Sequence, residues 1–378
     1  MKYSPPKRLF ELEESATLKA SEKANEMISK GIKVYKLDVG EPDFSTPKKI
    51  IDAAYQAMLN GLTHYAPSAG IPQLRRAIGE VYGVDQSYVI ATPGSKQAIF
   101  YALYSILNPG DEVIILNPAW PSYKQVVKLA GGNPVEVDTD EGFYPDVDSI
   151  KKRISERTRA IIVNSPNNPT GAVYSDSVVK ELSDLALQHN IFVISDEIYE
   201  KLVYEDSFVS FSKYIKYEEG LILINGFSKS YAMTGWRLGF AVAEPSIIKQ
   251  MAKIQGHTAT SPATFVQAAA VTALKECKDD VEAMVKEFSE RRKIVIEMLD
   301  KKGISYVKPK GAFYFFINLR RFIKDQDPAE YLLEKANVSV TSGAAFGESY
   351  SGYIRISYAT SRENIINGMN SIFKAIGV

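Results

Sequence analysis

The sequence is poor in the residues that build disulfides and metal centres. It contains one cysteine, Cys277, and three histidines, His64, His189 and His257. A single cysteine excludes an internal disulfide and fits a reducing compartment. The three histidines are far apart and lack the short spacing typical of metal ligands. We therefore expect no metal site.

The sequence also lacks net charge and long apolar runs. Lys plus Arg and Asp plus Glu are both 45, so the formal net charge is +0. A balanced surface argues against nucleic acid or anionic lipid as the main partner. No run approaches eighteen apolar residues, and the N-terminus has no apolar core of a signal peptide. We expect a soluble, cytoplasmic protein that binds neither nucleic acids nor membranes.

Two common nucleotide-binding motifs are missing as well. No Gly-x-x-x-x-Gly-Lys-Ser/Thr motif is present, and no Gly-x-Gly-x-x-Gly motif follows a predicted strand. These absences exclude a P-loop and disfavour a dinucleotide oxidoreductase.

The central part of the sequence alternates short apolar runs with helical patterns, which is typical of an α/β fold with a mostly parallel sheet. The predicted strands are 89–91, 113–116, 160–163, 191–194, 221–224 and 238–242. Asp176 is a plausible cap for a helix that ends at His189. Helices are also expected at 281–302, followed by Gly303, and after Thr360, which forms a possible capping box with Glu363. Together with strands at 313–317 and 353–357, they predict a smaller α+β domain. We place the large domain at 35–280, and the small domain at 281–378 together with the N-terminal segment 1–34.

Lys229 is the most informative residue of the sequence. It lies in Ser228-Lys229-Ser230, between the apolar runs 221–224 and 238–243. Burial of an unpaired ammonium favours the neutral amine, which is a nucleophile that can form an imine with an aldehyde. A solvated loop lysine is an equally acceptable interpretation of this motif alone.

Polar residues follow the other predicted strands, and ligands of such sheets bind beyond the carboxyl ends of the strands. Gly94 and Ser95 begin a helix whose free N–H groups suit a phosphate, although they also fit a glycine turn with a serine cap. Trp120 could stack on a flat ring or serve only in packing. Asn168 belongs to an Asn-Pro-Thr-Gly turn, and Asp196 is a partly buried carboxylate or a helix cap, with Tyr199 three residues later.

The combination is more specific than any of its members. A lysine nucleophile, a carboxylate for a ring nitrogen, a phenol, an amide, a flat aromatic ring and a phosphate cradle all converge on one edge of the sheet. Ser228 and Arg237 add a hydroxyl and a cation for the phosphate. Pyridoxal 5'-phosphate requires this set, because its aldehyde, phosphate and pyridine nitrogen each need one of these partners.

The sequence resembles the fold-type I pyridoxal-phosphate enzymes, specifically the class I aminotransferases of the aspartate aminotransferase group. The resemblance covers essentially the whole chain. It is carried by motifs in family order, namely Gly40-Glu41-Pro42-Asp43-Phe44, 65–70 (Tyr-Ala-Pro-Ser-Ala-Gly), 167–171 (Asn-Asn-Pro-Thr-Gly), 195–199 (Ser-Asp-Glu-Ile-Tyr) and Ser228-Lys229. It implies a seven-stranded sheet in the large domain and a homodimer with shared active sites.

The resemblance also implies roles for individual residues. Lys229 forms the imine with the cofactor and moves a proton, Asp196 pairs with the pyridine nitrogen, and Tyr199 and Asn168 hold the phenolic oxygen. Gly94, Ser95, Lys96, Ser228 and Arg237 surround the phosphate, Trp120 covers the ring, and Tyr65 reaches the phosphate of the neighbouring subunit. Arg355 grips the substrate α-carboxylate, on the side of the site that Gly40, Trp120 and Asn168 also line.

The substrate is predicted from the same resemblance. A lysine at the position of Lys96 is associated with acidic substrates, and the segment Ser15-Ala16-Thr17 closes over the site. We therefore expect transfer of an amino group from aspartate to 2-oxoglutarate by a ping-pong mechanism. Lys96 as a phosphate neighbour or a solvent-facing residue remains open, as do an aromatic or broad-specificity aminotransferase and a β-lyase on the same scaffold. A pyridoxal-phosphate-binding regulator is disfavoured, because we see no room for a DNA-binding module before Gly40.

Overall fold

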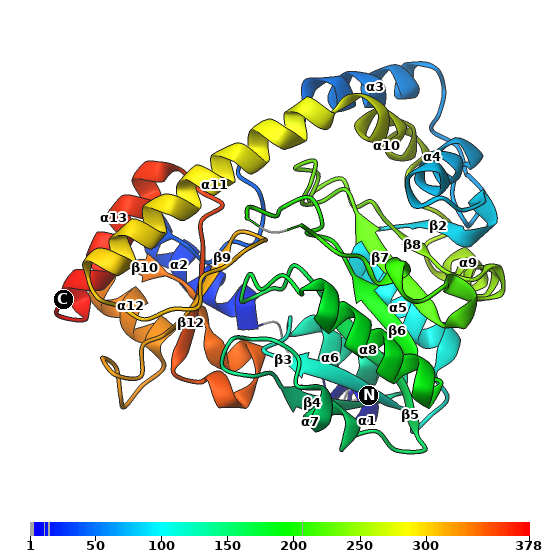
Figure 1. The fold of residues 1–378 in the computed structure, drawn as a ribbon. Helices are drawn as coiled ribbons and strands as arrows, with labels where there is room; N and C mark the ends of the chain where they lie inside the picture. The colour runs from blue at the N-terminus through cyan, green and yellow to red at the C-terminus, as the bar shows by residue number, and fades with distance from the viewer. Residues whose placement is uncertain (1–3, 11, 14–15, 206) are drawn as a thin grey trace.

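The computed structural model describes residues 4–10, 12–13, 16–205 and 207–378. A seven-stranded sheet forms its centre, with the strand order β2-β8-β7-β6-β5-β3-β4 (Figure 1). The strands are β2 (Val89–Thr92), β3 (Glu112–Asn117), β4 (Asn133–Asp138), β5 (Thr158–Asn164), β6 (Phe192–Asp196), β7 (Leu221–Gly226) and β8 (Gly239–Val242). Neighbours from β4 to β7 run parallel, and β8 runs antiparallel to both β7 and β2. The predicted α/β class and the mostly parallel sheet are therefore confirmed.

Helices cover both faces of this sheet, which explains why its central strands are apolar throughout. Neighbouring residues of β3 point to opposite faces of the sheet and belong to different hydrophobic cores. Ile114 shares its core with residues of α3, α4, α8 and α10, and Ile115 shares the other core with residues of α5, α6 and α9. The helices are α1 (Lys7–Phe10), α2 (Ala16–Ser29), α3 (Lys48–Leu59), α4 (Pro72–Tyr82), α5 (Ser95–Ile106), α6 (Ser122–Leu129), α7 (Val147–Lys151), α8 (Asp176–His189), α9 (Pro245–Thr258), α10 (Thr264–Glu276), α11 (Lys278–Lys301), α12 (Pro328–Ala336) and α13 (Arg362–Ala375). Burial on both faces is the usual state of a parallel sheet.

A second, smaller sheet lies at the other end of the molecule. It has the order β11-β12-β9, formed by β9 (Tyr314–Asn318), β11 (Thr341–Ser342) and β12 (Tyr353–Ser357), and all its pairs are antiparallel. The long helix α11 runs from α3 and α10 to α13 beside this sheet (Figure 1). A short parallel pair joins β1 (Tyr35–Lys36) to β10 (Val338–Ser339). The division of the chain at residues 35 and 281 stays a prediction.

Two predicted helix caps are wrong by one residue. Ser175, not Asp176, caps α8, with its hydroxyl accepting a hydrogen bond from the N–H of Val178. Asp176 is the first helical residue, and its carboxylate binds Lys213 and Tyr214 instead. Ser361 caps α13 through the N–H of Asn364, so Thr360 and Glu363 form no capping box. In both cases the predicted residue, Asp176 or Thr360, is a polar neighbour of the true cap, and the sequence alone does not distinguish the two.

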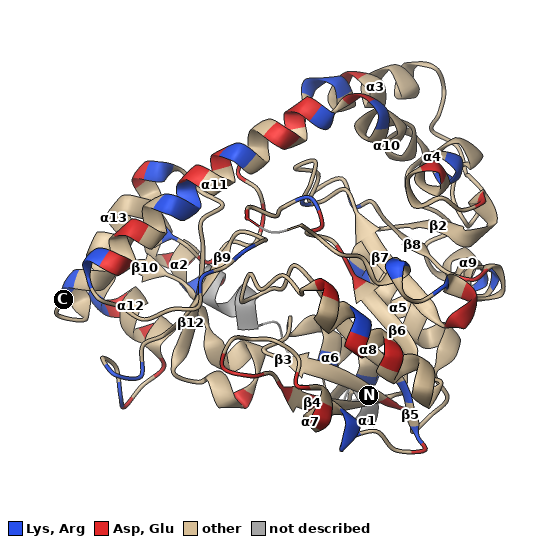
Figure 2. Cartoon of the chain, viewed as in Figure 1, with Lys and Arg blue, Asp and Glu red and all other residues tan. Residues whose placement is uncertain are grey.

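Charged residues of both signs are spread along the helices, while the strands of the large sheet consist mostly of residues without a charged side chain (Figure 2). Along α11 the two signs alternate, as expected for a helix with one solvated face. Within the described part of the chain, none of the helices combines the length and the apolar character needed to cross a bilayer.

Candidate active site

The candidate site lies beyond the carboxyl ends of the parallel strands. The register pairs Asn164 at the end of β5 with Asp196 at the end of β6, and Asp196 with Ile224 of β7. The last polar residues of these strands therefore lie at one level and open into a cavity of about 450 Å³. It is lined by Asp38, Val39, Gly40, Glu41, Ser95, Lys96, Trp120, Ser122, Tyr123, Asn164, Asn168, Asp196, Ile198, Tyr199, Ser228, Lys229, Thr234, Arg237, Tyr314 and Arg355. This volume is in the range of small-molecule sites.

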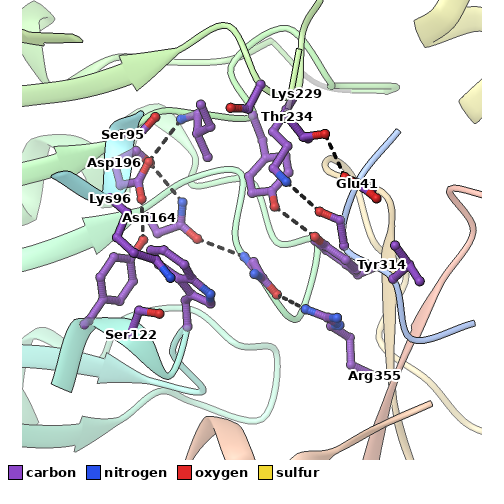
Figure 3. A pocket seen from close by; sticks show the side chains of 18 of the residues that line it. Glu41, Ser95, Lys96, Ser122, Asn164, Asp196, Lys229, Thr234, Tyr314 and Arg355 are labelled. Atoms are coloured by element: carbon purple, nitrogen blue, oxygen red, sulfur yellow. Dashed lines mark hydrogen bonds between the residues drawn. The ribbon is translucent and has the colours of Figure 1, made fainter. Parts of the chain in front are cut away.

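Lys229 reaches into the cavity from the loop that follows β7 (Figure 3). Its Nζ atom donates a hydrogen bond of 2.5 Å to the backbone oxygen of Gly40. Burial lowers the pKa of Lys229 to about 8, while the carboxylate of Glu41 opposes this effect and Arg355 adds to it. The neutral, nucleophilic amine is thus accessible near neutral pH.

Asp196 is the buried carboxylate of the site, with 3% of its surface exposed. Its Oδ2 atom accepts a hydrogen bond of 2.6 Å from the Tyr123 hydroxyl, and its Oδ1 atom accepts one of 3.2 Å from the N–H of Ile198. Burial raises the pKa of Asp196 to about 6, against the lowering effect of these hydrogen bonds. A cationic or N–H partner in the cavity would stabilise the ionised form.

The N-terminus of α5 forms an anion cradle on the same side of the cavity. Gly94, with φ of 87°, makes the turn from β2 into this helix. A Cβ atom at Gly94 would lie 2.5 Å from Nη2 of Arg237, so glycine lets the guanidinium approach the helix end. Burial lowers the pKa of Lys96, and the neighbouring Arg237 lowers it further. Two close cations at a helix N-terminus favour a bound anion.

Arg355 lies on the opposite side of the cavity, 3% exposed, on β12. Its Nη1 atom donates to Oδ1 of Asn168 at 3.0 Å, and its Nη2 atom donates to the backbone oxygen of Asp38 at 2.7 Å. The guanidinium carbon lies 4.4 Å from the ring centroid of Tyr314. The Nε atom has no hydrogen-bond partner. A rigid, incompletely satisfied guanidinium of this kind suits a carboxylate ligand.

Aromatic side chains complete the walls. The hydroxyls of Tyr199 and Tyr314 are 2.9 Å apart, and burial raises the pKa of Tyr199 well above its usual value. Trp120 packs edge-on against Tyr123, with a centroid distance of 5.4 Å, and Nζ of Lys96 lies 4.8 Å from its ring. The cavity therefore offers Trp120 for a flat ring, the N-terminus of α5 for an anionic substituent, and Asp196 for a ring nitrogen.

Nearly all predicted site residues come together in this cavity. Gly94 does not line it but makes the turn before Ser95, and Tyr65 is not among the lining residues and has 91% of its surface exposed. Ser15 of the expected closing segment is outside the described residues, and Ala16 and Thr17 begin α2. Their predicted roles stay predictions.

Several lining residues were not predicted from the sequence. Tyr123 follows Trp120 by three positions, and its hydroxyl is the partner of Asp196. Asn164 accepts a hydrogen bond from the N–H of Asn168 and donates one to the backbone oxygen of Asp196, at 2.9 Å each. The position of Asn164 at the end of β5 was a usable signal, whereas Tyr123 lies in the first turn of α6. Tyr314 and Thr234 gave none, because their partners are far away in the sequence.

The known proteins that this chain resembles are aminotransferases. The family model described as aminotransferase class I and II matches residues 32–372. An aspartate aminotransferase of Pyrococcus horikoshii is 44% identical, over 98% of both chains. An aromatic-amino-acid aminotransferase of Thermococcus litoralis is 40% identical, over 92% of this chain and 93% of its own.

The fold agrees with these relatives. The solved structure of aspartate aminotransferase from Thermus thermophilus with maleate superposes with a TM-score of 0.95 at 40% identity, covering 99% of this chain and 100% of that one. The aspartate aminotransferase-like fold inferred from the motifs is therefore confirmed, and the chain belongs to the class I and II aminotransferases.

Proposed function

We propose that this aminotransferase uses pyridoxal 5'-phosphate to move the amino group of aspartate to 2-oxoglutarate in two half-reactions. The observation that carries the proposal is that Lys229, Asp196 and Arg355 line the same cavity. Lys229 and Asp196 lie on the side of the large sheet, and Arg355 lies on the side of the small sheet. This arrangement places a nucleophilic amine between an anion cradle and a carboxylate-binding guanidinium.

The residues of the cavity fit the cofactor part by part. Its phosphate would be held by Ser95 at the N-terminus of α5 together with Ser228 and Arg237, and its ring would lie against Trp120. Asp196 would pair with the ring nitrogen, since a carboxylate with a pKa of about 6 gains a partner in a protonated pyridine. Tyr199 and Asn168 would take the phenolic oxygen. When bound, the cofactor supplies an electron sink for the bond to Cα that is broken.

The chain's own groups supply binding and proton transfer. Arg355 grips the α-carboxylate with its two-pronged guanidinium and so fixes Cα relative to Lys229. The Lys229 amine is the base that takes the Cα proton and later returns it. Trp120 and the tyrosine pair Tyr199–Tyr314 line this volume and would exclude water from it once substrate is bound.

Lys96 supports the choice of an acidic substrate. Its ammonium lies 4.8 Å from the ring centroid of Trp120, and both side chains line the cavity. The structural relative from Thermus thermophilus was solved with maleate, a dicarboxylate. We infer that Lys96 reads the distal carboxylate of aspartate.

An aromatic or broad-range aminotransferase is the second candidate. The relative from Thermococcus litoralis carries an aromatic-amino-acid name, and the cavity wall includes Trp120, Tyr123 and Tyr314. An aromatic side chain could pack on this wall without a charge partner.

We further propose a cytoplasmic homodimer in which Tyr65 of each subunit reaches the phosphate of the other site. The exposure of Tyr65 supports this role, since a bulky aromatic with 91% exposure has room for a partner. Apolar side chains exposed on α3, Ile51, Tyr55, Met58 and Leu59, would be covered in the same interface.

The test is a half-reaction experiment with the purified, cofactor-loaded protein. Single amino acids are added without an acceptor, and the visible absorbance and the released keto acid are measured. We expect aspartate to remove the band with one equivalent of oxaloacetate, and 2-oxoglutarate to restore it. Faster bleaching by phenylalanine than by aspartate would favour the aromatic candidate. Release of pyruvate and ammonia without an acceptor would indicate a β-lyase.

A further inference from the structure

Two consecutive residues of the N-terminal segment hold the loop after β7 at two points. The backbone oxygen of Gly40 accepts the 2.5 Å hydrogen bond from Nζ of Lys229. The next residue, Glu41, accepts a 2.7 Å hydrogen bond at Oε2 from the hydroxyl of Thr234. Figure 3 shows both interactions side by side at the wall of the cavity. The two contacts join positions that lie 189 and 193 residues apart in the sequence.

Further hydrogen bonds hold the same segment on both sides of Gly40 and Glu41. Asp38 accepts from Arg355 through its backbone oxygen, and Thr46 donates from its hydroxyl to the backbone oxygen of Ala232 at 2.6 Å. A Cβ atom at Gly40 would lie 2.9 Å from the Tyr314 hydroxyl, so the backbone there is held close to the small sheet. Residues 38–46 therefore connect the carboxylate-binding guanidinium to the loop of the lysine. Glu41 has a fixed place in this connection.

The electrostatic surroundings of Lys229 give Glu41 a specific effect. Burial lowers the pKa of Lys229, and the carboxylate of Glu41 is the largest influence that raises it. Of the other charged groups that face the amine, Arg355 and Arg237 lower its pKa and Asp196 raises it. The ring of Phe313 also lies near the amine, with its centroid 5.9 Å from Nζ. Glu41 is exposed, whereas Asp196 is buried and committed to Tyr123.

We propose that Glu41, held by Thr234, is a positioning residue that keeps the ammonium of Lys229 tied to Gly40 and so sets how much neutral amine can attack an aldehyde. The inference rests on the proposed function, because the aldehyde in question is that of the cofactor. In the attack the nitrogen lone pair forms a bond to the carbonyl carbon. The carbonyl oxygen then leaves as water with two protons, which come from the nitrogen.

The test measures this reaction in the cofactor-free protein. Pyridoxal without its phosphate is the probe, so that the anion cradle does not limit binding, and the rate of imine absorbance is followed from pH 6 to 10. Lys229→Ala provides the blank. In Glu41→Gln we expect the midpoint of the pH–rate profile to fall by about half a unit, because an opposite charge that favoured the ammonium is gone. At pH 7 the variant then reacts about threefold faster than the wild type.

Variants of the partner residue separate this role from a general effect on folding. Thr234→Val keeps the carboxylate but removes its anchor, and we expect a downward shift smaller than that of Glu41→Gln. Thr234→Ser keeps the hydroxyl and should retain the wild-type midpoint. Glu363→Gln, an exposed change on α13, is the matched control. Each variant is compared with the wild type by circular dichroism and melting temperature.

The outcomes distinguish this inference from the proposed function. A midpoint that stays unchanged or rises in Glu41→Gln, with a Lys229-dependent signal present, overturns the role of Glu41 and leaves the function intact. A wild-type signal no larger than that of Lys229→Ala overturns both. A downward shift in Glu41→Gln and Thr234→Val, but not in Thr234→Ser, supports the proposal.

Discussion

Arg355 on β12 donates a 3.0 Å hydrogen bond to Asn168 in the loop after β5. This contact joins the small sheet to the turn that is expected to hold the cofactor's phenolic oxygen. The guanidinium therefore has a fixed orientation before any substrate arrives, which is the condition for bidentate recognition of a carboxylate.

Arg355→Lys should weaken substrate recognition selectively. A lysine keeps the charge but loses the planar fork, so it cannot offer a carboxylate two parallel N–H groups held by Asn168. We expect kcat/KM for aspartate to fall by a factor of about 30 to 1,000, which corresponds to about 2–4 kcal/mol. Cofactor affinity, measured by titration of absorbance, should change little. Arg362→Lys, at an exposed ion pair with Glu287, is the control, and a loss below threefold in Arg355→Lys would contradict its role.

Lys96→Met tests the choice between an acidic and an aromatic substrate. Methionine keeps an apolar stem against Trp120 and removes only the charge. If Lys96 reads a distal carboxylate, kcat/KM for aspartate should fall about tenfold or more, the value of a hydrogen bond to a charged group, while that for phenylalanine changes less than about threefold. Equal losses for both amino acids would indicate that Lys96 serves the phosphate instead.

Glu197 makes the stability of the protein dependent on pH. It is 1% exposed, and burial, aided by the nearby charge of Glu200, raises its pKa to about 8. In the unfolded chain this carboxyl ionises near pH 4.3. The folded protein thus holds a proton that the unfolded chain releases, and the free energy of unfolding falls as the pH rises from about 4.3 to about 8.

Glu197→Gln should remove this dependence. The hydroxyls of Ser195 and Ser210 donate to Oε1 of Glu197, and a glutamine oxygen can accept the same bonds. We expect the variant to be more stable than the wild type by about 2–4 kcal/mol at pH 8.5, and by less than about 1 kcal/mol at pH 4.5. Urea unfolding of the cofactor-free protein measures the difference. Exposed Glu181→Gln on α8 is the control, and a pH-independent difference in Glu197→Gln would show the prediction to be wrong.

Mixed dimers test the contribution of Tyr65 across the interface. Tyr65→Ala and Lys229→Ala should each be impaired as homodimers. In a mixed dimer, one site keeps Lys229 and receives an intact Tyr65 from the other subunit, so it should work at the wild-type rate. Activity after mixing and refolding should therefore exceed the sum of the two parents. No gain in a mixture shown to contain hybrids would mean that Tyr65 does not act across subunits.

Much of the large sheet could be predicted because its physical basis is local. Strands buried on two faces are continuous apolar runs, and the predicted bounds differ from the observed ones by at most two residues. The edge strand β4 was missed, because it contains Pro134, has only one fully buried residue and does not stand out as an apolar run.

The site could be predicted where a polar residue ends a strand or follows it within a few residues. Asp196 and Lys229 fall in this class, since the sheet itself brings strand ends together. The hydrogen bond from Thr234 to Glu41 joins two loops that are far apart in the sequence, and the contact of Tyr314 with Arg355 depends on the pairing of β9 with β12 in the small sheet. The first contact joins residues that are 193 positions apart, and neither contact leaves a pattern in the segments that it joins.

The central claim is that Lys229 is the amine that carries the cofactor. The most direct measurement is reduction of the cofactor-loaded protein with borohydride, followed by proteolysis and mass spectrometry of the peptides. We predict one pyridoxyl-modified lysine, Lys229, and no modified peptide in Lys229→Ala. A label on any other lysine, or a label that persists in the Lys229→Ala variant, would contradict the account.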